Sequence, residues 1–424
     1  MVQTQIEKKQ IIMVVISIGL ILVSQMIGNA IVILCSLAFY LFTILSAPMG
    51  YLIPMMLFYL PWSPIIKLSP GSISFVSVAT LLVFIRIFFM QKKVLIHKKI
   101  FLSIFGLFLV TFLSKIFHGY GFATSYIMFF VMLITFPMLN DRYSDATSFE
   151  ITVIFFALGI ILTTVASIIC AGNDNIYKYI VVMNDQYLGV TRHCGFYSDP
   201  NFYAAQVTPA VGALLVIVSN KEEKRWFSII LIIALIMCGI TSLSKSFLLC
   251  LTLIFAIWLL SLVVTKPSMF LVALLLMVTS LFLVLSTDMF SDVIDQYLIR
   301  FGRVTDSSSL TTGRSDLWKE YIAFLWDNPL EAILGQGFTS VFNSVRKGSH
   351  NTIIQLIYQF GLIGICFLFS WVMSFRKSQE KPKFFVTILL FASCFSMWMG
   401  LDTLFFDDFF LIIMLFFLGI NHYT

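Results

Sequence analysis

Long runs of apolar residues divide this chain, and they limit what it can fold into. Examples are Ile11–Leu45, Ile151–Cys170, Trp226–Val264 and Met269–Leu285. A helix needs about 20 apolar residues to cross a bilayer, and within hydrocarbon it satisfies its own backbone groups. Hydrophobic residues make up 59% of the 424 residues and charged residues 11%, which leaves too little polar surface for a soluble protein. The sequence therefore predicts an all-α polytopic membrane protein, with 1–424 as one integral-membrane domain in a lipid bilayer.

The lengths of the apolar runs predict about 14 transmembrane helices. Their centres are near Leu20, Leu37, Met56, Leu81, Leu107, Met132, Leu158, Gly212, Leu235, Phe255, Leu275, Leu362, Leu390 and Leu411. The first three boundaries are the least distinct, because prolines at 48 and 61 interrupt an almost continuous apolar region. The first run follows two lysines and is longer than the apolar part of a signal peptide, so we expect it to be a membrane helix.

Loops rich in Lys and Arg predict which side of the membrane each loop faces. Short basic loops are usually cytoplasmic, and those near residues 8–9, 92–99, 221–225, 266 and 376–383 fall on one side when the spans alternate. The alternation places the loop 171–199 and the large loop 287–349 outside, with both termini in the cytoplasm. Arg86 is the one obvious charge that we assign to the inside of a span.

Other classes of site find little support in the sequence. The seven cysteines have no metal-site or disulfide spacing. No basic stripe with interleaved aromatic residues indicates nucleic-acid binding. The acidic residues of the outer segments are interpreted as loop or cap charges (Asp288, Asp292, Asp295) and as a short outer turn (Asp402, Asp407, Asp408). No pair of carboxylates has convincing metal spacing, so no metal and no cofactor is predicted.

The stretch "TRHCGFYSDPNFYAAQ", Thr191–Gln206, contains a helix start. Asp199 is a suitable N-cap and Pro200 a suitable first helical residue. The beginning of a span explains these two residues, but it does not explain Arg192 and His193 just before it. We therefore consider both for substrate binding.

The stretch "TSLSKSFLLC", Thr241–Cys250, predicts a tight outer hairpin between two spans. Ser and Thr are common in turns and caps, and this structural role alone would account for most of the hexapeptide. Lys245 also offers an ammonium group near the membrane surface, a point charge suited to phosphate.

The stretch from Ser307 to Phe338 predicts an amphipathic helix along the membrane interface. From Ser315, apolar residues recur on one helical face, and Pro329 is expected to end the segment. Interfacial anchoring alone would explain the aromatic residues. Arg314, however, lies at the N-terminus of this helix, where a guanidinium fork and peptide N–H groups together bind phosphate well.

The stretch "VRKGSHNTIIQLIYQFGLIG", Val345–Gly364, places a histidine at the start of a span. We expect Ser349 to cap the helix, with His350 and Asn351 in its first turn, and with Arg346 nearby. A lone histidine near a membrane surface is often incidental. The alternative is that it serves as a base or orients a substrate hydroxyl.

Together these four patterns resemble the O-antigen polymerase and ligase superfamily of bacterial polysaccharide assembly. The resemblance covers mainly 191–364 and rests on "GFYSDPN", the Ser-Lys-Ser hairpin, "TTGRSDLW…NPLEAILGQGF" and "SHNTIIQLIYQFGLIG". It implies catalytic roles for His350, Arg314 and Arg192, and substrate binding by Lys245, His193, Asn351 and Arg346. Members often have arginine in the hairpin, so Lys245 departs from the pattern and lacks bidentate geometry.

The resemblance also implies a reaction and a location. Such proteins use undecaprenyl diphosphate-linked oligosaccharides, without a metal, on the outer face of the bacterial cytoplasmic (inner) membrane. A flippase and a chain-length regulator are the candidate protein partners. The expected activity is polymerisation: transfer of a growing glycan from undecaprenyl diphosphate to a lipid-linked repeat unit of a capsule, exopolysaccharide or O-antigen.

Two alternatives stay open. A polysaccharide ligase would use the same donor with a different acceptor, such as lipid A-core. A glycolipid flippase or transporter is an alternative of another class, which usually shows internal repeats and ionisable residues at mid-membrane. We see no repeat in the sequence, and the concentration of cations in the outer loops favours an enzyme.

Overall fold

The structure is a computed structural model that describes most of the chain. It leaves out residues 1–7, 91–96, 122–123, 180–182, 186–189, 198, 222–224, 287–290, 303–310, 312, 340, 343–344, 347, 378–379, 405–406 and 424. The statements below concern the described residues.

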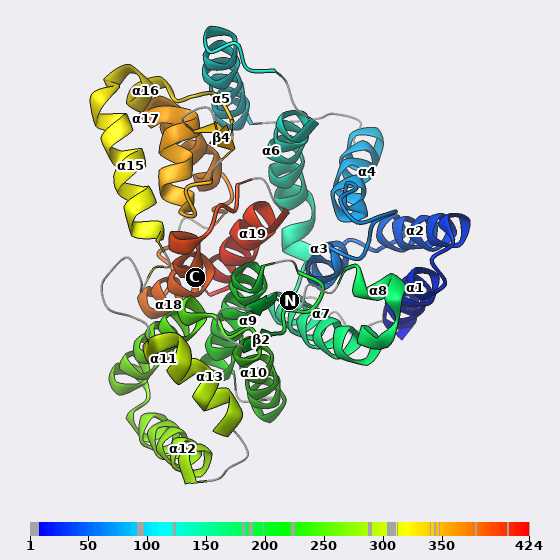
Figure 1. The fold of residues 1–424 in the computed structure, drawn as a ribbon, viewed down its shortest axis with the longest axis vertical. Helices are drawn as coiled ribbons and strands as arrows, with labels where there is room; N and C mark the ends of the chain where they lie inside the picture. The colour runs from blue at the N-terminus through cyan, green and yellow to red at the C-terminus, as the bar shows by residue number, and fades with distance from the viewer. Residues whose placement is uncertain are drawn as a thin grey trace.

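Helices dominate the structure, with two small strand hairpins between them (Figure 1). The first half contains α1 (Lys8–Ile27), α2 (Ala30–Leu45), α3 (Leu52–Tyr59), α4 (Phe75–Met90), α5 (Lys98–Phe117), α6 (Thr124–Tyr143), α7 (Phe149–Ile169), α8 (Asp174–Tyr177), β1 (Met183–Asp185), β2 (Val190–Arg192) and α9 (Pro200–Asn220). The second half contains α10 (Arg225–Ile240), α11 (Lys245–Thr265), α12 (Pro267–Ser286), α13 (Ser291–Gly302), α15 (Arg314–Asp327), α16 (Pro329–Leu334), β3 (Val341–Phe342), β4 (Val345–Arg346), α17 (Thr352–Met373), α18 (Phe384–Phe395) and α19 (Asp407–His422).

Seven of the described helices are long and apolar enough to cross a membrane: α1, α5, α6, α7, α9, α11 and α17. This confirms a helical membrane protein. All fourteen predicted span centres also lie within helices, but a total of 14 crossings stays a prediction. The shortest of these helices is α3, eight buried residues that continue into a single 3-10 turn at Leu60–Trp62.

The core lies around α9 and α19, near the middle of the view in Figure 1. Nearly every side chain of these two helices is buried. Helices α7, α10, α11 and α18 pack around α9. Apart from the buried α3, the helices farther from this centre carry apolar side chains that remain exposed in the isolated protein, as expected for a surface in contact with lipid.

Hydrogen bonds group the helix ends into two sets. At one end, Asn175 Nδ2 donates to Met26 O at 3.1 Å, and Gln25 Nε2 donates to Ile65 O at 3.0 Å. These two bonds join the segments at the C-terminal ends of α1, α3 and α7. At the other end, Arg86 Nη1 donates to Leu45 O at 2.6 Å. The chain thus passes from one end to the other between α2 and residue 65, through α3. We call the end that holds Met26 and Ile65 the site end.

The opposite end is held together by basic residues of the predicted cytoplasmic loops. Lys377 Nζ lies 2.9 Å from Asp145 Oδ1, and Lys221 pairs with Glu150. These contacts group the helix ends as the predicted alternation requires. Which end faces the outside of the cell stays a prediction.

Helix α15 is amphipathic as expected, but its details differ from the prediction. It begins at Arg314, as the sequence predicts, but Pro329 begins a second helix, α16, rather than ending the segment, because proline is well suited to a first helical turn. Leu317 and Tyr321 pack with Phe342 and Tyr358 in a small apolar cluster. This cluster holds α15 against α17.

Helix α17 is broken at Gly361, whose φ of 62° is not helical. A loop from the preceding segment fills the break. The backbone N–H of Gln336 donates to Tyr358 O at 2.8 Å, and that of Gly337 donates to Gln359 O at 2.9 Å. The break therefore frees carbonyl groups that the loop after α16 satisfies.

Replacing Gly335 in this loop by alanine should destabilise the protein strongly. A Cβ there would lie 2.5 Å from Gln359 O and Gly361 N, and the φ of Gly335 is +77°. Steric overlap and the left-handed backbone together should cost about 2–5 kcal/mol of unfolding free energy. The measurement is thermal unfolding of the purified protein in detergent.

The matched control is Gly121→Ala, where an added Cβ would meet nothing within 4 Å. We expect this change to leave the unfolding midpoint nearly unaltered. Equal midpoints for Gly335→Ala and wild type would show that the loop does not dock on α17 as described.

Candidate functional site

Arg192 is held in a buried position at the site end by the β1–β2 hairpin, in which it pairs with Met183. Its side chain is only 7% exposed, and Nε donates to Ser242 O at 2.8 Å. The Nη2 group is buried and has no hydrogen-bond partner among the described residues. Burial lowers the pKa of Arg192 to about 10, and the positive charge of Arg300 adds to this effect. A buried guanidinium with an unused N–H group favours an anionic ligand.

The predicted outer hairpin forms at Thr241–Ser244 and lies directly beside Arg192. Ser244 caps α11, and its hydroxyl donates to Asn201 Oδ1 at 2.7 Å. Asn201 in turn donates to Asp199, the predicted cap of α9, which is confirmed. These bonds join the first turns of α9 and α11. Lys245, the first residue of α11, therefore lies in this group, with Nζ 5.8 Å from the ring centroid of Phe301.

Arg300 is a site residue that the sequence analysis missed. It lies on α13, where Tyr297 packs with Leu243 of the hairpin and donates a hydrogen bond to Ile240 O. The recurrence of Val293, Tyr297 and Phe301 every four residues could have predicted this apolar helical face. In the sequence, the acidic residues of this stretch are interpreted as loop or cap charges, and no role is predicted for Arg300.

Arg314 reaches the same region from the start of α15. Gly313, in the left-handed conformation with φ of 78°, precedes it. A Cβ on Gly400 would lie 3.1 Å from Arg314 Nη1 and 3.8 Å from Ser246 Oγ, so the guanidinium is close to the first turn of α11. Burial lowers the pKa of Arg314, while Asp199 and Asp402 act in the opposite direction.

The loop that carries His350 is organised by Asp402. The Asp402 carboxylate accepts from Ser349 Oγ at 2.6 Å, from the His350 backbone N–H at 2.9 Å and from the Asn351 backbone N–H at 3.3 Å. Trp318 of α15 donates its Nε1–H to Ser349 O at 3.0 Å. The loop is therefore fixed to α15, the helix that Arg314 begins.

Two predictions about this loop are wrong. Asn351, not Ser349, caps α17, because its side chain accepts from the backbone N–H groups of Ile353 and Ile354. His350 precedes the helix instead of lying in its first turn, and its backbone has a φ of +50°. Its side chain is exposed. Ser349 serves Asp402 instead, as an O–H donor.

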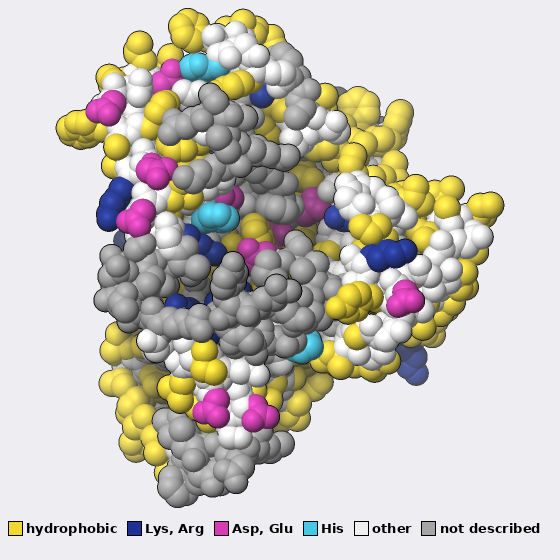
Figure 2. Space-filling model, viewed as in Figure 1, with side chains coloured by type: hydrophobic (Ala, Val, Ile, Leu, Met, Phe, Trp, Pro, Cys, Tyr) yellow, Lys and Arg dark blue, Asp and Glu magenta, His cyan; other side chains and the backbone are white. Residues whose placement is uncertain are grey.

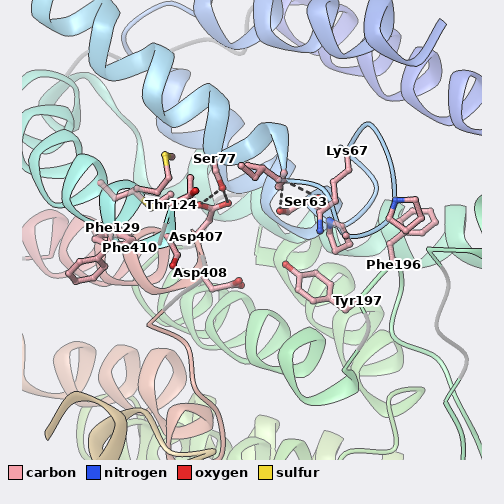
Figure 3. A pocket seen from close by; sticks show the side chains of 18 of the residues that line it. Ser63, Lys67, Ser77, Thr124, Phe129, Phe196, Tyr197, Asp407, Asp408 and Phe410 are labelled. Atoms are coloured by element: carbon pink, nitrogen blue, oxygen red, sulfur yellow. Dashed lines mark hydrogen bonds between the residues drawn. The ribbon is translucent and has the colours of Figure 1, made fainter. Parts of the chain in front are cut away.

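The acidic turn is also corrected. Only Asp402 lies in the loop before α19, whereas Asp407 and Asp408 are buried in the first turn of that helix. Ser77 and Gln206 donate to their carboxylates. Asp407 and Asp408 line a cavity, shown in Figure 3, whose described lining contains neither Arg192 nor Arg314.

Most of the predicted site residues thus meet at one end of the bundle. We call Arg192, Lys245, Arg300 and Arg314 the cation cluster. The His350 loop lies next to this cluster, because Asp402 both binds the loop and interacts with Arg314. Figure 2 shows Lys and Arg side chains gathered near the middle of the visible face, with acidic side chains beside them. His193 is exposed, and its backbone N–H donates to Thr241 O. Arg346 lies on β4, but its side chain lies outside the described residues.

The cluster is suited to an anion with several oxygen atoms. Its four cations come from β2, α11, α13 and α15 instead of forming a stripe along one helix. Arg300 interacts electrostatically with Arg192 and Lys245, and Asp199 interacts with both Arg192 and Arg314. Arginine forks bind phosphate oxygens in a bidentate manner. In the described part of the chain, no group of three or more His, Cys, Asp or Glu side chains is placed to hold a metal ion.

Comparison with known proteins adds no assignment. No protein-family model matches the chain, and no curated protein matches it with significance. The resemblance described above therefore rests on the motifs alone.

Proposed function

We propose that this protein is a membrane glycosyltransferase of the O-antigen polymerase and ligase superfamily, and that it acts as a polysaccharide polymerase. The observation that carries this proposal is the buried Arg192, whose Nη2 lacks a described hydrogen-bond partner, within a cluster of four cations beside the His350 loop. The donor is a growing glycan on undecaprenyl diphosphate. The acceptor is a sugar hydroxyl of a lipid-linked repeat unit.

The cation cluster would stabilise the leaving group. As the bond between the anomeric carbon and the phosphate oxygen breaks, negative charge grows on the diphosphate, and fixed guanidinium groups lower the energy of that charge. The cations are held in advance by Ser242, by the α13 contacts and by Asp402, so little reorganisation accompanies the reaction.

His350 would act on the acceptor. A sugar hydroxyl is a weak nucleophile, so it benefits from a base that removes its proton as the new carbon–oxygen bond forms. The imidazole would take that proton, and the diphosphate would leave with the bonding electrons. The exposed position of His350 leaves room for an acceptor, while Asp402 fixes its backbone.

The proposal requires the site end to face the outside of the cell. If so, cysteine at Asp327, on α15, should react with an impermeant thiol reagent in intact cells, while cysteine at Asp145 should not. Asp145 is a suitable partner position because its side chain is 81% exposed at the opposite end. Labelling of Asp145→Cys alone would invert the orientation and contradict the proposal.

The function itself is tested by the glycans that accumulate after deletion of the gene. Loss of a polymerase should leave single repeat units on the outer face, still attached to their lipid. Finished but unattached polymer would instead indicate a ligase, and repeat units facing the cytoplasm would indicate a flippase. Either of the last two results would overturn the polymerase assignment.

A further inference from the structure

A cavity of about 560 Å³ lies at the site end, next to the cation cluster but separate from it. Its size falls within the range of about 300–1,000 Å³ found for small-molecule sites. Helix α19 supplies Asp407 and Asp408, and the loop after α3 supplies Lys67 (Figure 3). Its described lining contains none of the predicted site residues.

Two segments connect this cavity with the site. Tyr197 lines the cavity and lies two residues before Asp199, which interacts with Arg192 and Arg314. Leu404 also lines the cavity and lies two residues after Asp402. Two residues of extended chain span about 7 Å. The cavity and the cation cluster are therefore neighbours in the fold.

The cavity wall offers hydrogen-bond acceptors from Asp407 and Asp408. Among the described residues, Ser77 Oγ donates to both oxygens of Asp407 at 3.0 and 3.1 Å, and Gln206 Nε2 donates to Asp408 Oδ1. A carboxylate has about four lone-pair sites. These bonds therefore leave acceptor capacity for a ligand that carries several O–H groups.

The remaining wall favours an uncharged ring. The charged residues of the described lining are two aspartates, Asp407 and Asp408, and two lysines, Lys67 and Lys178, so their formal charges cancel. Aromatic side chains complete the wall, among them Phe129, Phe196 and Phe410. Aromatic faces carry partial negative charge and attract the weakly positive C–H groups of a ring face.

From this chemistry we propose that the cavity binds neutral sugar rings of the glycan, with Asp407 and Asp408 accepting hydrogen bonds from their hydroxyls. The assignment of the ligand rests on the proposed function, because the cavity would hold the saccharide while the cation cluster holds its diphosphate. It adds a subsite that the reaction mechanism above does not use. A cation bound between the two carboxylates is the competing occupant.

The test measures saccharide binding separately from catalysis. The probe is the free oligosaccharide released by mild acid from the strain's own lipid-linked repeat unit, titrated into the full-length protein in detergent. Loss of a hydrogen bond to a charged group should weaken its binding about tenfold or more in Asp408→Asn. Ser125→Trp, on the cavity wall, should weaken it too without altering a buried carboxylate.

Two controls make the result specific. Asp145→Asn is the same chemical change at the opposite end of the bundle and should bind the saccharide like the wild type. Binding of undecaprenyl diphosphate should persist in Asp408→Asn and Ser125→Trp, which also shows that both variants fold. Saccharide binding by the wild type must not require Ca²⁺ or Na⁺, because a requirement for a cation would identify the competing occupant.

The outcomes separate this inference from the proposed function. If the wild type binds the saccharide and both cavity variants lose this binding, the cavity assignment is supported. It is supported even if the wild type makes no polymer, because that result would overturn only the proposed function. Polymer synthesis by the wild type, with saccharide affinity unchanged in both variants, would overturn the cavity assignment alone. Absence of saccharide binding by the wild type would overturn it as well.

Discussion

Arg314→Lys should lower polymer synthesis about 10²-fold or more, which is the usual cost of removing one fixed donor from a developing negative charge. The variant keeps the charge but loses the planar fork that contacts two phosphate oxygens at once. The half-buried position of Arg314 near Asp402, Asp199 and Gly400 limits how far a lysine could move to compensate. The measurement is the initial rate of polymerisation of purified lipid-linked repeat units in proteoliposomes.

The same substitution at Arg376 provides the control, because Arg376 is exposed at the opposite end and donates to Glu380 O. Its rate should match that of the wild type. Arg192→Lys should behave like Arg314→Lys, since Nε already bonds to Ser242 O and Nη2 is the group left for substrate. A normal rate and a normal polymer length for either site variant would show that the residue is only a loop cation and does not bind the diphosphate.

His350→Ala should lower the transfer rate by about 10²–10⁴-fold, the usual contribution of a general base, while leaving donor binding nearly intact. The structure also supplies a sharper variant. Asparagine tolerates the left-handed backbone that His350 adopts, so His350→Asn keeps the loop and removes the base. We expect both variants to be equally slow.

The assay has its own internal controls. His350→Gly preserves the backbone conformation without any side chain and should match His350→Ala. Rescue by asparagine would show that His350 orients the acceptor through a hydrogen bond. Near-normal turnover by His350→Ala would contradict both the role as a base and the role as an orienting residue.

The lengths of the apolar runs predicted where the fourteen expected membrane-span helices lie, because these lengths reflect the local requirement that apolar side chains and backbone groups avoid water. The helix start at Asp199–Pro200 and the turn before Lys245 were equally accessible, because capping and turn preferences depend on a few neighbouring residues. The same local chemistry brought Arg314 to the start of α15.

Contacts between distant segments could not be read in this way. Asp402 organises a loop about 50 residues away, and nothing in its own surroundings in the sequence predicts that partner. Burial of Asp407 and Asp408 depends on Ser77 and Gln206, which approach only when three helices have packed. The cap at Asn351 was missed because the left-handed backbone of His350 shifts the start of α17.

The break in α17 has a consequence for the order in which the protein becomes rigid. Two carbonyl groups near the break are satisfied by N–H groups at 336 and 337, and in lipid each unsatisfied backbone group costs several kcal/mol. The loop therefore cannot leave α17 without a large penalty. Trp318 and the apolar cluster that contains Leu317 and Tyr358 attach α15 to the same helix. Helices α15 and α16 and the start of α17 therefore form one rigid unit. The fold itself therefore sets the spacing between Arg314 and His350 once this unit has assembled.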